Sequence, residues 1–348
     1  MIKYLGSKRT LVPVLSTLAE ASGAKSSLDL FTGTTRVAQA FKKSGQFVTA
    51  SDVAAYSFAF AKTWIELDGS RANQRELTDA IAQLNSLKGE AGYFTKSFCE
   101  DARYFQPKNG QLVDAIRNEI EKHYRDSWLY YPLLTSLIMA ADKVDSTTGI
   151  QMAYLKSWSA RSHATMSLKD PGLLPGAGRA IQGDVLELAA TMPEVDLAYL
   201  DPPYNQHRYF ANYHVWETLV RWDAPDSYGI ANKRIDVRDD ATKSVFNSKK
   251  TMASALGQVI ADLKCETLML SYNNESWLSR DELAAICAPK GEVAILDFDF
   301  KRYVGSLIGV YNKKGDRVSE PTHTRNIEHV VIAGPKATVE RMLSAIKH

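Results

Sequence analysis

The chain has 348 residues, of which 45% are hydrophobic and 24% charged, proportions close to those of ordinary globular proteins. This length allows one large domain or two moderate ones, and no apolar run is long enough to span a bilayer. A net charge of +2 is too small to indicate a polyanion partner, so a nucleic-acid surface would need local clusters of basic residues. The odd number of cysteines (Cys99, Cys265, Cys287), without metal-ligand spacing, and the absence of a leader pattern predict a soluble cytoplasmic protein without zinc or disulfides.

The first predicted helix begins just after a small, flexible pair of residues. Gly6 and Ser7 stand between Tyr4 and Lys8, and a helical pattern then continues to about Ala21. Because a helix N-terminus attracts anions and Lys8 adds positive charge, this segment is a candidate site for a carboxylate or a phosphate. The alternative is an ordinary basic helix start.

A strand, a turn of small residues and a helix are predicted over residues 27–41, as in the first βα unit of a nucleotide-binding sheet. Only Gly33 stands where a dinucleotide fold requires G-x-G-x-x-G, so the NAD fingerprint is absent. A second strand leads to Asp52, which follows Asp29 at roughly the 20-residue spacing of an acid that binds ribose hydroxyls. An isolated aspartate after a strand is more often a helix cap, and this alternative stays open.

The most informative stretch is a short apolar strand over 195–200 that leads into Asp201, Pro202, Pro203 and Tyr204. Ligands of open α/β sheets bind beyond the carboxyl ends of the strands, so the acid is expected in a cleft. The Asp201 carboxylate and the Pro202 carbonyl, held rigid by proline, can each accept one N–H of a nucleobase amine. Tyr204 offers a face on which a flipped base can stack. The alternative is a proline-stiffened turn whose aspartate caps a helix.

Residues 70–178 have a different pattern, with helical periodicity at 74–88 and 111–124 and a longer apolar helix from Trp128 to about Ala141. We interpret this segment as a largely helical insertion that ends in a linker rich in proline and glycine. The sheet then resumes with a strand over 180–185 that contains Gly183 and Asp184. Further strands are predicted at 267–273, 292–296, 303–311 and 327–333.

Basic residues gather in local clusters that could hold DNA phosphates or read guanine edges. Two clusters lie among aromatic residues of the insertion, a third lies between 233 and 250, and a fourth lies in a predicted hairpin over 301–325. The candidate DNA-binding residues are Arg103, Lys156, Arg161, Lys243, Lys301, Arg302, Lys313, Lys314 and Arg317. The alternatives are a hydrophobic core for the aromatics of the insertion and a solvated hairpin for the last cluster.

The order of these motifs resembles that of the amino-group DNA methyltransferases, specifically the Dam-like adenine-N6 enzymes of the α arrangement. Such enzymes have an aromatic-x-Gly-x-Lys segment, a D-x-F-x-G loop, a target-recognition insertion and then Asp-Pro-Pro-Tyr. This chain has them at 4–8, 29–33, about 70–178 and 201–204. The match covers most of the chain, and Thr35 departs from it where the family commonly has a second glycine. The segment that follows Tyr204 looks like that of a subset of the family associated with restriction–modification systems.

The resemblance implies an α/β fold, a Rossmann-like class I methyltransferase sheet with an inserted, mainly helical target-recognition domain. It divides the chain into 1–69 for cofactor binding, 70–178 for target recognition and 179–348 for the catalytic site and the hairpin. The implied cofactor is S-adenosyl-L-methionine. Its implied ligands are Tyr4, Gly6, Ser7, Lys8, Asp29, Phe31, Gly33, Thr34, Thr35, Asp52, Asp184, Val185 and Asp201, and the implied catalytic residues are Asp201, Pro202, Pro203 and Tyr204.

The predicted activity is site-specific methylation of adenine N6 in double-stranded DNA, within a prokaryotic restriction–modification system. Alternatives are methylation of cytosine N4, of RNA or of a protein glutamine amide, or a catalytically silent DNA-binding module of the same fold. Asp rather than Asn at position 201 argues against the glutamine-amide enzymes and many of the RNA enzymes. The recognition sequence and the pairing with a restriction endonuclease stay open at this stage.

Overall fold

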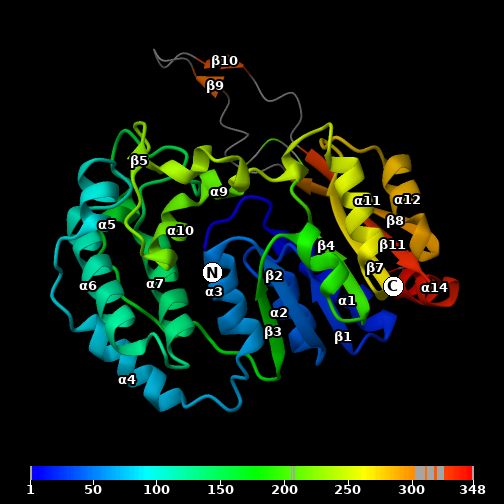
Figure 1. Cartoon of the computed structure of the whole chain (residues 1–348), viewed down its shortest axis with the longest axis horizontal. Coiled ribbons are helices and arrows are strands. Elements are labelled where there is room, and N and C mark those ends of the chain that lie inside the picture. The colour runs from blue at the N-terminus through cyan, green and yellow to red at the C-terminus, as the bar shows by residue number, and fades with distance from the viewer. Residues whose placement is uncertain are drawn as a thin grey trace.

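The computed structural model describes residues 2–204, 206, 208–301, 310–311, 317–319 and 325–346. Within them, a seven-stranded sheet in the order β3-β2-β1-β4-β7-β11-β8 forms the centre of the molecule (Figure 1). Neighbouring strands from β3 to β7 are parallel, and β11 pairs antiparallel with both β7 and β8. These strands are β1 (Ser26–Asp29), β2 (Phe47–Asp52), β3 (Gly178–Gln182), β4 (Val195–Leu200), β7 (Cys265–Asn273), β8 (Glu292–Lys301) and β11 (Arg325–Gly334). The predicted α/β, Rossmann-like sheet is confirmed.

Helices cover both faces of this sheet. In β4, Leu197 and Tyr199 belong to one core and Ala198 and Leu200 to the other, because successive side chains of a strand point to opposite faces. The first core includes side chains of α1 (Val12–Ser22), α2 (Arg36–Lys43), α3 (Ala55–Ala61) and α14 (Lys336–Ile346). The second includes α8 (Val185–Leu188), α11 (Met252–Asp262) and α12 (Arg280–Cys287). Burial on both faces explains why the strands are nearly continuous apolar runs.

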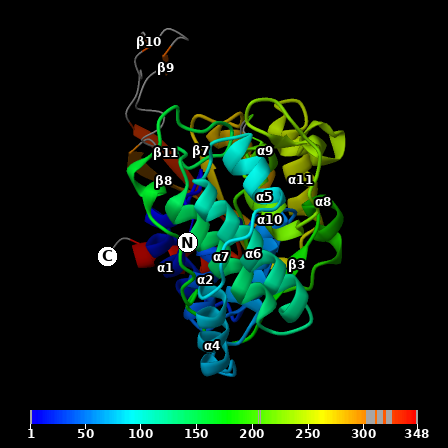
Figure 2. The ribbon, with the colours of Figure 1, turned by 90° about the vertical axis from the view of Figure 1, so that its left-hand side faces the viewer.

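A group of helices from the chain between β2 and β3 lies beside the sheet (Figure 1) and faces the viewer in Figure 2. They are α4 (Gln74–Asn85), α5 (Tyr93–Thr95), α6 (Pro107–Tyr124) and α7 (Tyr130–Val144). Helices α4, α6 and α7 match the helical patterns expected in that part of the sequence, whereas α5 was not expected and the division into domains stays a prediction. Both α7 and α10 (His214–Arg221), which follows α9 (Tyr209–Asn212), pack against α3. Among the helices of the described ranges, none has the length and apolarity needed to cross a membrane.

Aromatic residues of the insertion are buried in the same core as the helices on the first face of the sheet. Phe94, Phe98, Tyr104 and Phe105 are each at most 1% exposed, and the rings of Phe94 and Phe98 meet at a centroid distance of 5.0 Å. The core interpretation of these aromatics is confirmed. Burial excludes them as side chains that stack on DNA from the surface.

Two predicted strands differ from the observed ones. β3 ends at Gln182 instead of residue 185, because the Asp184 carboxylate accepts the Leu186 N–H at 2.8 Å and caps α8. β8 continues past the predicted end to Lys301.

The predicted hairpin of the last third is described only in part. Its short strands β9 (Val310–Tyr311) and β10 (Arg317–Ser319) pair antiparallel. The turn over 312–316 and most of the predicted strand over 303–311 lie outside the described residues.

Candidate active site

A cavity lies at the carboxyl ends of three neighbouring parallel strands. β1 ends at Asp29, β2 ends at Asp52, and β4 leads directly into Asp201. Because carboxyl ends of parallel strands meet at one edge of a sheet, these three acids line the same cavity. Further predicted site residues that line it are Tyr4, Gly6, Ser7, Lys8, Phe31, Gly33, Thr34, Asp184, Val185, Pro203 and Lys243. The structure thus brings together most of the residues implied for the cofactor.

The N-terminal segment is held over the cavity by aromatic side chains. The ring of Tyr4 stacks on Tyr213 at a centroid distance of 4.7 Å, and the Leu5 N–H donates to the Tyr213 hydroxyl at 2.6 Å. Gly6 has φ +72°, and a Cβ there would come within 3.0 Å of the Tyr209 hydroxyl. This position therefore requires glycine for both its backbone conformation and its close contact.

Lys8 is only 8% exposed and lies between two carboxylates. Its Nζ is 3.0 Å from Asp201 Oδ1 and also forms an ion pair with Glu328 of β11. Asn273 of β7 donates from Nδ2 to Glu328 Oε2 at 3.4 Å. The sequence predicted that Lys8 would hold an anion of a ligand. In the structure its ammonium pairs with two carboxylates of the chain itself, while its side chain still lines the cavity.

The surroundings of Asp201 and Tyr204 determine their protonation. Burial raises the pKa of Asp201 to about 6, Lys8 opposes this rise and Glu328 adds to it. The Tyr204 ring packs edge-on against Tyr272 at 5.6 Å, with Lys8 Nζ 5.7 Å from its centre. Burial raises the pKa of Tyr204 to about 12, so its hydroxyl stays protonated at neutral pH. Asp201 is therefore the member of this pair that can act as an anionic acceptor.

The Asp29 carboxylate has one oxygen that is available to a ligand. Asp29 is 1% exposed; Oδ2 accepts the Thr32 hydroxyl at 3.0 Å, and Oδ1 has no hydrogen-bond partner in the described part of the chain. Burial raises the pKa of Asp29 to about 7, although the Thr32 hydroxyl lowers it. A buried acceptor without a partner is costly unless a ligand supplies the donor. An ammonium group would satisfy this oxygen and lower the pKa.

The Asp52 carboxylate accepts hydrogen bonds from two backbone segments. Its Oδ2 accepts the Gly33 N–H at 2.9 Å, and its Oδ1 accepts the Ala54 N–H at 3.0 Å just before α3. The N-cap residue of α3 is Ala54 and no side chain caps this helix, so the helix-cap alternative for Asp52 is not borne out. Each carboxylate oxygen has a second lone pair, so Asp52 can still accept a hydroxyl from the cavity.

Thr35 replaces the second glycine of the resembling family and keeps a glycine-like backbone. Its φ is 60° and its ψ 16°, in the left-handed region, and it is fully buried. Its Oγ1 accepts from Gln39 Nε2 at 2.8 Å. Gly33 is left-handed too, with φ +50°, and a Cβ there would lie 3.1 Å from the Tyr4 ring. The loop therefore follows the same kind of path at a cost of about 1–2 kcal/mol in backbone strain. Thr35 itself is not among the residues that line the cavity.

Sequence reasoning missed several residues of the cavity. Phe246, whose ring packs edge-on against the predicted Phe31 at 5.2 Å, and Val53, which is 61% exposed, both line the cavity and were not predicted. Arg36 and Arg208 line the cavity as well. The ion-pair partner of Lys8, Glu328, was also missed, and its only sequence signal was a carboxylate in a largely apolar strand.

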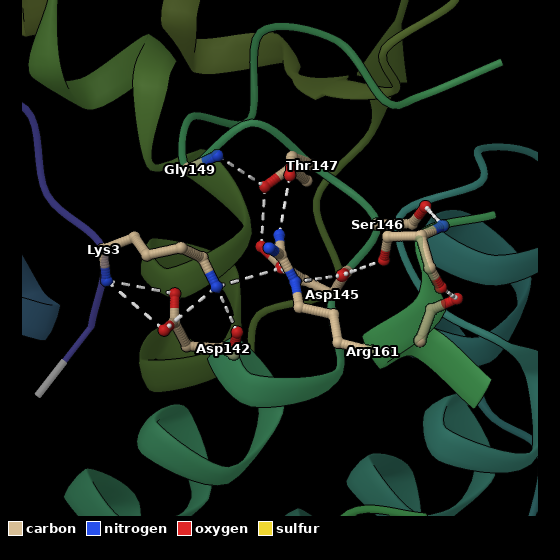
Figure 3. A network of polar contacts seen from close by, with 9 residues as sticks. Lys3, Asp142, Asp145, Ser146, Thr147, Gly149 and Arg161 are labelled. Carbon is tan, nitrogen blue, oxygen red and sulfur yellow. Dashed lines mark hydrogen bonds and ion pairs between the residues drawn. The ribbon is translucent and has the colours of Figure 1, made fainter. Parts of the chain in front are cut away.

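Arg161, a candidate DNA contact, is bound within the protein (Figure 3). Its Nε donates to Asp145 Oδ1 at 2.9 Å and its Nη2 to the Thr147 carbonyl at 2.6 Å. The same Asp145 pairs with Lys3 at 3.1 Å, and Lys3 also pairs with Asp142 at 3.2 Å. Arg161 is thus engaged with Asp145 and Thr147, and its role as a DNA contact stays a prediction. Two carboxylates and two cations link the N-terminal segment to the chain after α7.

The other basic candidates are placed as follows. Arg103 stacks on Trp158 at 4.9 Å and donates to the Lys156 carbonyl at 2.9 Å, so its guanidinium is also engaged internally. Lys156 is exposed, and Lys243, at the cavity, pairs with Asp240. The side chains of Lys301, Arg302, Lys313, Lys314 and Arg317 lie outside the described part of the structure.

The sequence of this chain matches a family of known proteins. The D12 class N6 adenine-specific DNA methyltransferase family matches residues 4–286. A Streptococcus sanguinis protein named modification methylase StsI is 30% identical over 87% of this chain and 49% of its own length. The type II methyltransferase M.NlaIII of Neisseria lactamica is 28% identical over 92% of this chain and 98% of its own length. The type II methyltransferase M.FokI of Planomicrobium okeanokoites is 28% identical over 83% of this chain and 47% of its own length.

The chain thus spans about half the length of two of these relatives and nearly all of the third. A solved precorrin-8w decarboxylase of Methanobacterium thermoautotrophicum is similar at a TM-score of 0.30 and 8% identity, over 95% of this chain and 93% of that one, and bears on nothing further. The match to the family extends from Tyr4 through the D-x-F-x-G loop to Asp-Pro-Pro-Tyr and beyond. The chain belongs to the D12 class of N6 adenine-specific DNA methyltransferases.

Proposed function

We propose that this chain transfers a methyl group from S-adenosylmethionine to N6 of adenine at specific sites in double-stranded DNA, as part of a restriction–modification system. The observation that carries this proposal is the placement of Asp201. Its carboxylate stands at the end of β4, is paired with Lys8 and lines a cavity shared with Asp29 and Asp52. Family membership supports adenine as the base and DNA as the substrate.

The residues of the cavity fit S-adenosylmethionine. Asp29, with its unpaired oxygen, would hold the ammonium of the methionine part, and Asp52 would accept ribose hydroxyls. The apolar side chains Phe31, Val53 and Phe246 would cover the adenine ring. When bound, this cofactor supplies a methyl group on a sulfonium, which is an activated donor. The protein therefore needs to contribute positioning and charge stabilisation more than bond activation.

Asp201 and the Pro202 carbonyl act on the target amine. Each accepts one N–H of the exocyclic amine and so draws its lone pair out of conjugation with the ring. As the amine gains positive charge, the partly buried Asp201 carboxylate stabilises that charge. A pKa of about 6 keeps Asp201 mainly ionised at neutral pH, as this role requires. Tyr204 provides the face on which the flipped base stacks.

We also propose that residues 70–178 read the target sequence. Their helices form a layer beside the catalytic sheet, and α7 packs against α3. The candidate base and phosphate contacts left in this segment are exposed side chains such as Lys156. The division into residues 1–69, 70–178 and 179–348 follows from this proposal.

The test is transfer of tritium from labelled S-adenosylmethionine to duplex DNA by the purified chain, followed by digestion and separation of the nucleosides. Label in N6-methyladenine supports the proposal, and label in N4-methylcytosine identifies the alternative reaction. Structured RNA serves as a parallel substrate. DNA binding without any transfer would indicate a catalytically silent module.

The link to restriction needs its own experiment. Genomic DNA from cells that express the chain is sequenced for methylated adenines, and the same DNA is challenged with a nuclease that cleaves the mapped site. Protection at that site supports a modification role. Methylated but still cleavable sites would contradict it.

A further inference from the structure

Glu328 is a buried acid whose position links two parts of the active site. It lies on β11, is 7% exposed and pairs with Lys8, which is 320 positions away in the sequence. β11 is antiparallel to β7, so Glu328 sits opposite Asn273 at the carboxyl end of β7. This register brings a C-terminal strand to the edge of the sheet where the catalytic strands end.

The charges of this cluster do not balance. Among the residues that the structure describes, Lys8 is the cation paired with both Asp201 and Glu328, and these three groups carry a net charge of −1 when ionised. Burial of a carboxylate costs several kcal/mol unless its pairing is excellent, and an apolar side chain would serve a strand core better. Stability alone therefore gives no reason for a carboxylate at this point of β11.

The two contacts of Lys8 also restrain each other. An ammonium has three donors; here one reaches Asp201 Oδ1 and another reaches Glu328 Oε1. Without Glu328, the ammonium would be free to move toward both oxygens of Asp201. It would then compete with a target amine for the same acceptor.

We propose that Glu328 is a positioning residue for methyl transfer: it holds the Lys8 ammonium to one oxygen of Asp201 and so keeps the Asp201 carboxylate available to the target amine. This inference rests on the proposed function. Glu328 also raises the pKa of Asp201, in addition to the larger effect of burial. Further titratable groups near the cluster are Asp29 of β1, Tyr199 of β4, Tyr204, Tyr209 of α9 and Glu275 after β7.

The variant Glu328→Gln separates this role from a structural one. We expect its single-turnover rate at neutral pH to fall on the order of tenfold with the KM for DNA little changed, because the acceptor is misplaced after binding. The acid limb of its pH profile, where the rate falls as pH decreases, should move to lower pH. The reason is that Glu328→Gln removes a like charge beside Asp201. Lys8→Met should move that limb to higher pH, and the double variant should lie between the two. A double-variant shift that differs from the sum of the two single shifts would show that the two groups are coupled through direct contact.

Glu292→Gln is the matched control, with the same charge change on the neighbouring strand. Glu292 pairs in register with Gly334, whereas Glu328 pairs with Phe298, so the two sites are roughly 20 Å apart along the sheet. It should keep the wild-type rate and acid limb. All profiles are measured at saturating S-adenosylmethionine.

Glu328→Asp covers the case in which the glutamine variant does not fold. It keeps the charge but shortens the side chain, so the rate should fall without a downward shift of the acid limb. A wild-type rate and limb in either folded variant would overturn the role of Glu328 while leaving methyl transfer intact. Absence of transfer by the wild-type chain itself would overturn both the proposed function and this inference.

Discussion

Two ion clusters of this protein contain similar buried acids but have different surroundings. In the linking cluster of Lys3, Asp142, Asp145 and Arg161, two cations balance two carboxylates. In the catalytic cluster of Lys8, Asp201 and Glu328, one cation faces two carboxylates beside a cavity.

Burial raises the pKa of Asp142 to about 6, and it raises the pKa of Asp201 to about 6 as well. A perturbed pKa by itself therefore does not separate the two clusters. Charge balance and access to the cavity do: only Asp201 has a ligand site before it. An acid in a charge-balanced cluster away from the cavity stabilises the fold, whereas an acid in an unbalanced cluster at the cavity can act on a substrate.

The largest effect should come from removing the acid of the catalytic cluster. We expect Asp201→Ala to lower the single-turnover methylation rate by at least about 100-fold while DNA binding persists, because the lost acceptor acts on the amine and not on phosphates. The matched change in the linking cluster, Asp142→Asn, should keep most of the rate. A rate for Asp201→Ala above a tenth of wild type would contradict the role given to this carboxylate.

Tyr204 tests the aromatic side of the same cluster. Tyr204→Ala should lower transfer roughly 5- to 150-fold, the equivalent of about 1–3 kcal/mol of stacking on the flipped base. Tyr204→Phe should remain active, because it keeps the ring. A target adenine opposite an abasic site should rescue the alanine variant more than it helps wild type, since extrusion is then easier. A phenylalanine variant as inactive as the alanine variant would show that the hydroxyl is needed.

Removing a cation from the linking cluster should affect stability more than activity. Arg161→Met is expected to lower the free energy of unfolding by about 2 kcal/mol, because it breaks charged hydrogen bonds to a buried carboxylate. Urea unfolding measures this change, with Arg103→Met as the control that removes a stacked guanidinium without a carboxylate partner. If Arg161 instead held a phosphate, the log–log salt slope of DNA binding would fall by about 0.9.

The pH dependence of the rate should come from the catalytic cluster. The pKa of Asp201 is raised to about 6, so the acceptor is lost as pH falls through that value, because a protonated carboxyl is neutral. The single-turnover rate should then decrease about tenfold for each further pH unit. Asp142→Asn should leave this acid limb in place, although Asp142 has a similar pKa. A limb near pH 4 would mean that Asp201 titrates as an ordinary carboxyl.

The smallest effect on stability is expected for Thr35, in the loop between β1 and α2. Thr35→Gly should change the free energy of unfolding by less than about 1 kcal/mol, because relief of the left-handed strain offsets the lost Gln39 hydrogen bond. Thr35→Ala keeps the strain and loses the bond, so it should be destabilised by about 1 kcal/mol. Equal stabilities of the two variants in urea would show that the strain at this residue is not significant.

Much of the fold and of the site could be predicted because their signals are local. Apolar runs predicted β1, β2 and β4, and helical periodicity predicted α4, α6 and α7. Asp29, Asp52 and Asp201 could be placed together in advance, since each follows a strand of one parallel sheet. The end of β3 was wrong by a few residues, because the cap formed by Asp184 starts a helix where the apolar pattern continues.

The sequence by itself determined strands β1, β2 and β4, helices α4, α6 and α7, the three acids at the strand ends and the Asp-Pro-Pro-Tyr motif. Periodicity, turn chemistry and motif spacing are properties of neighbouring residues. Only the tertiary structure decided that Lys8 pairs with Glu328, that Arg161 is bound to Asp145 and that Phe246 covers the cavity. These contacts join segments that are far apart or unrelated in pattern. A charged side chain carries no local sign of its partner; the antiparallel register of β11 and the packing of the helices beside the sheet select it.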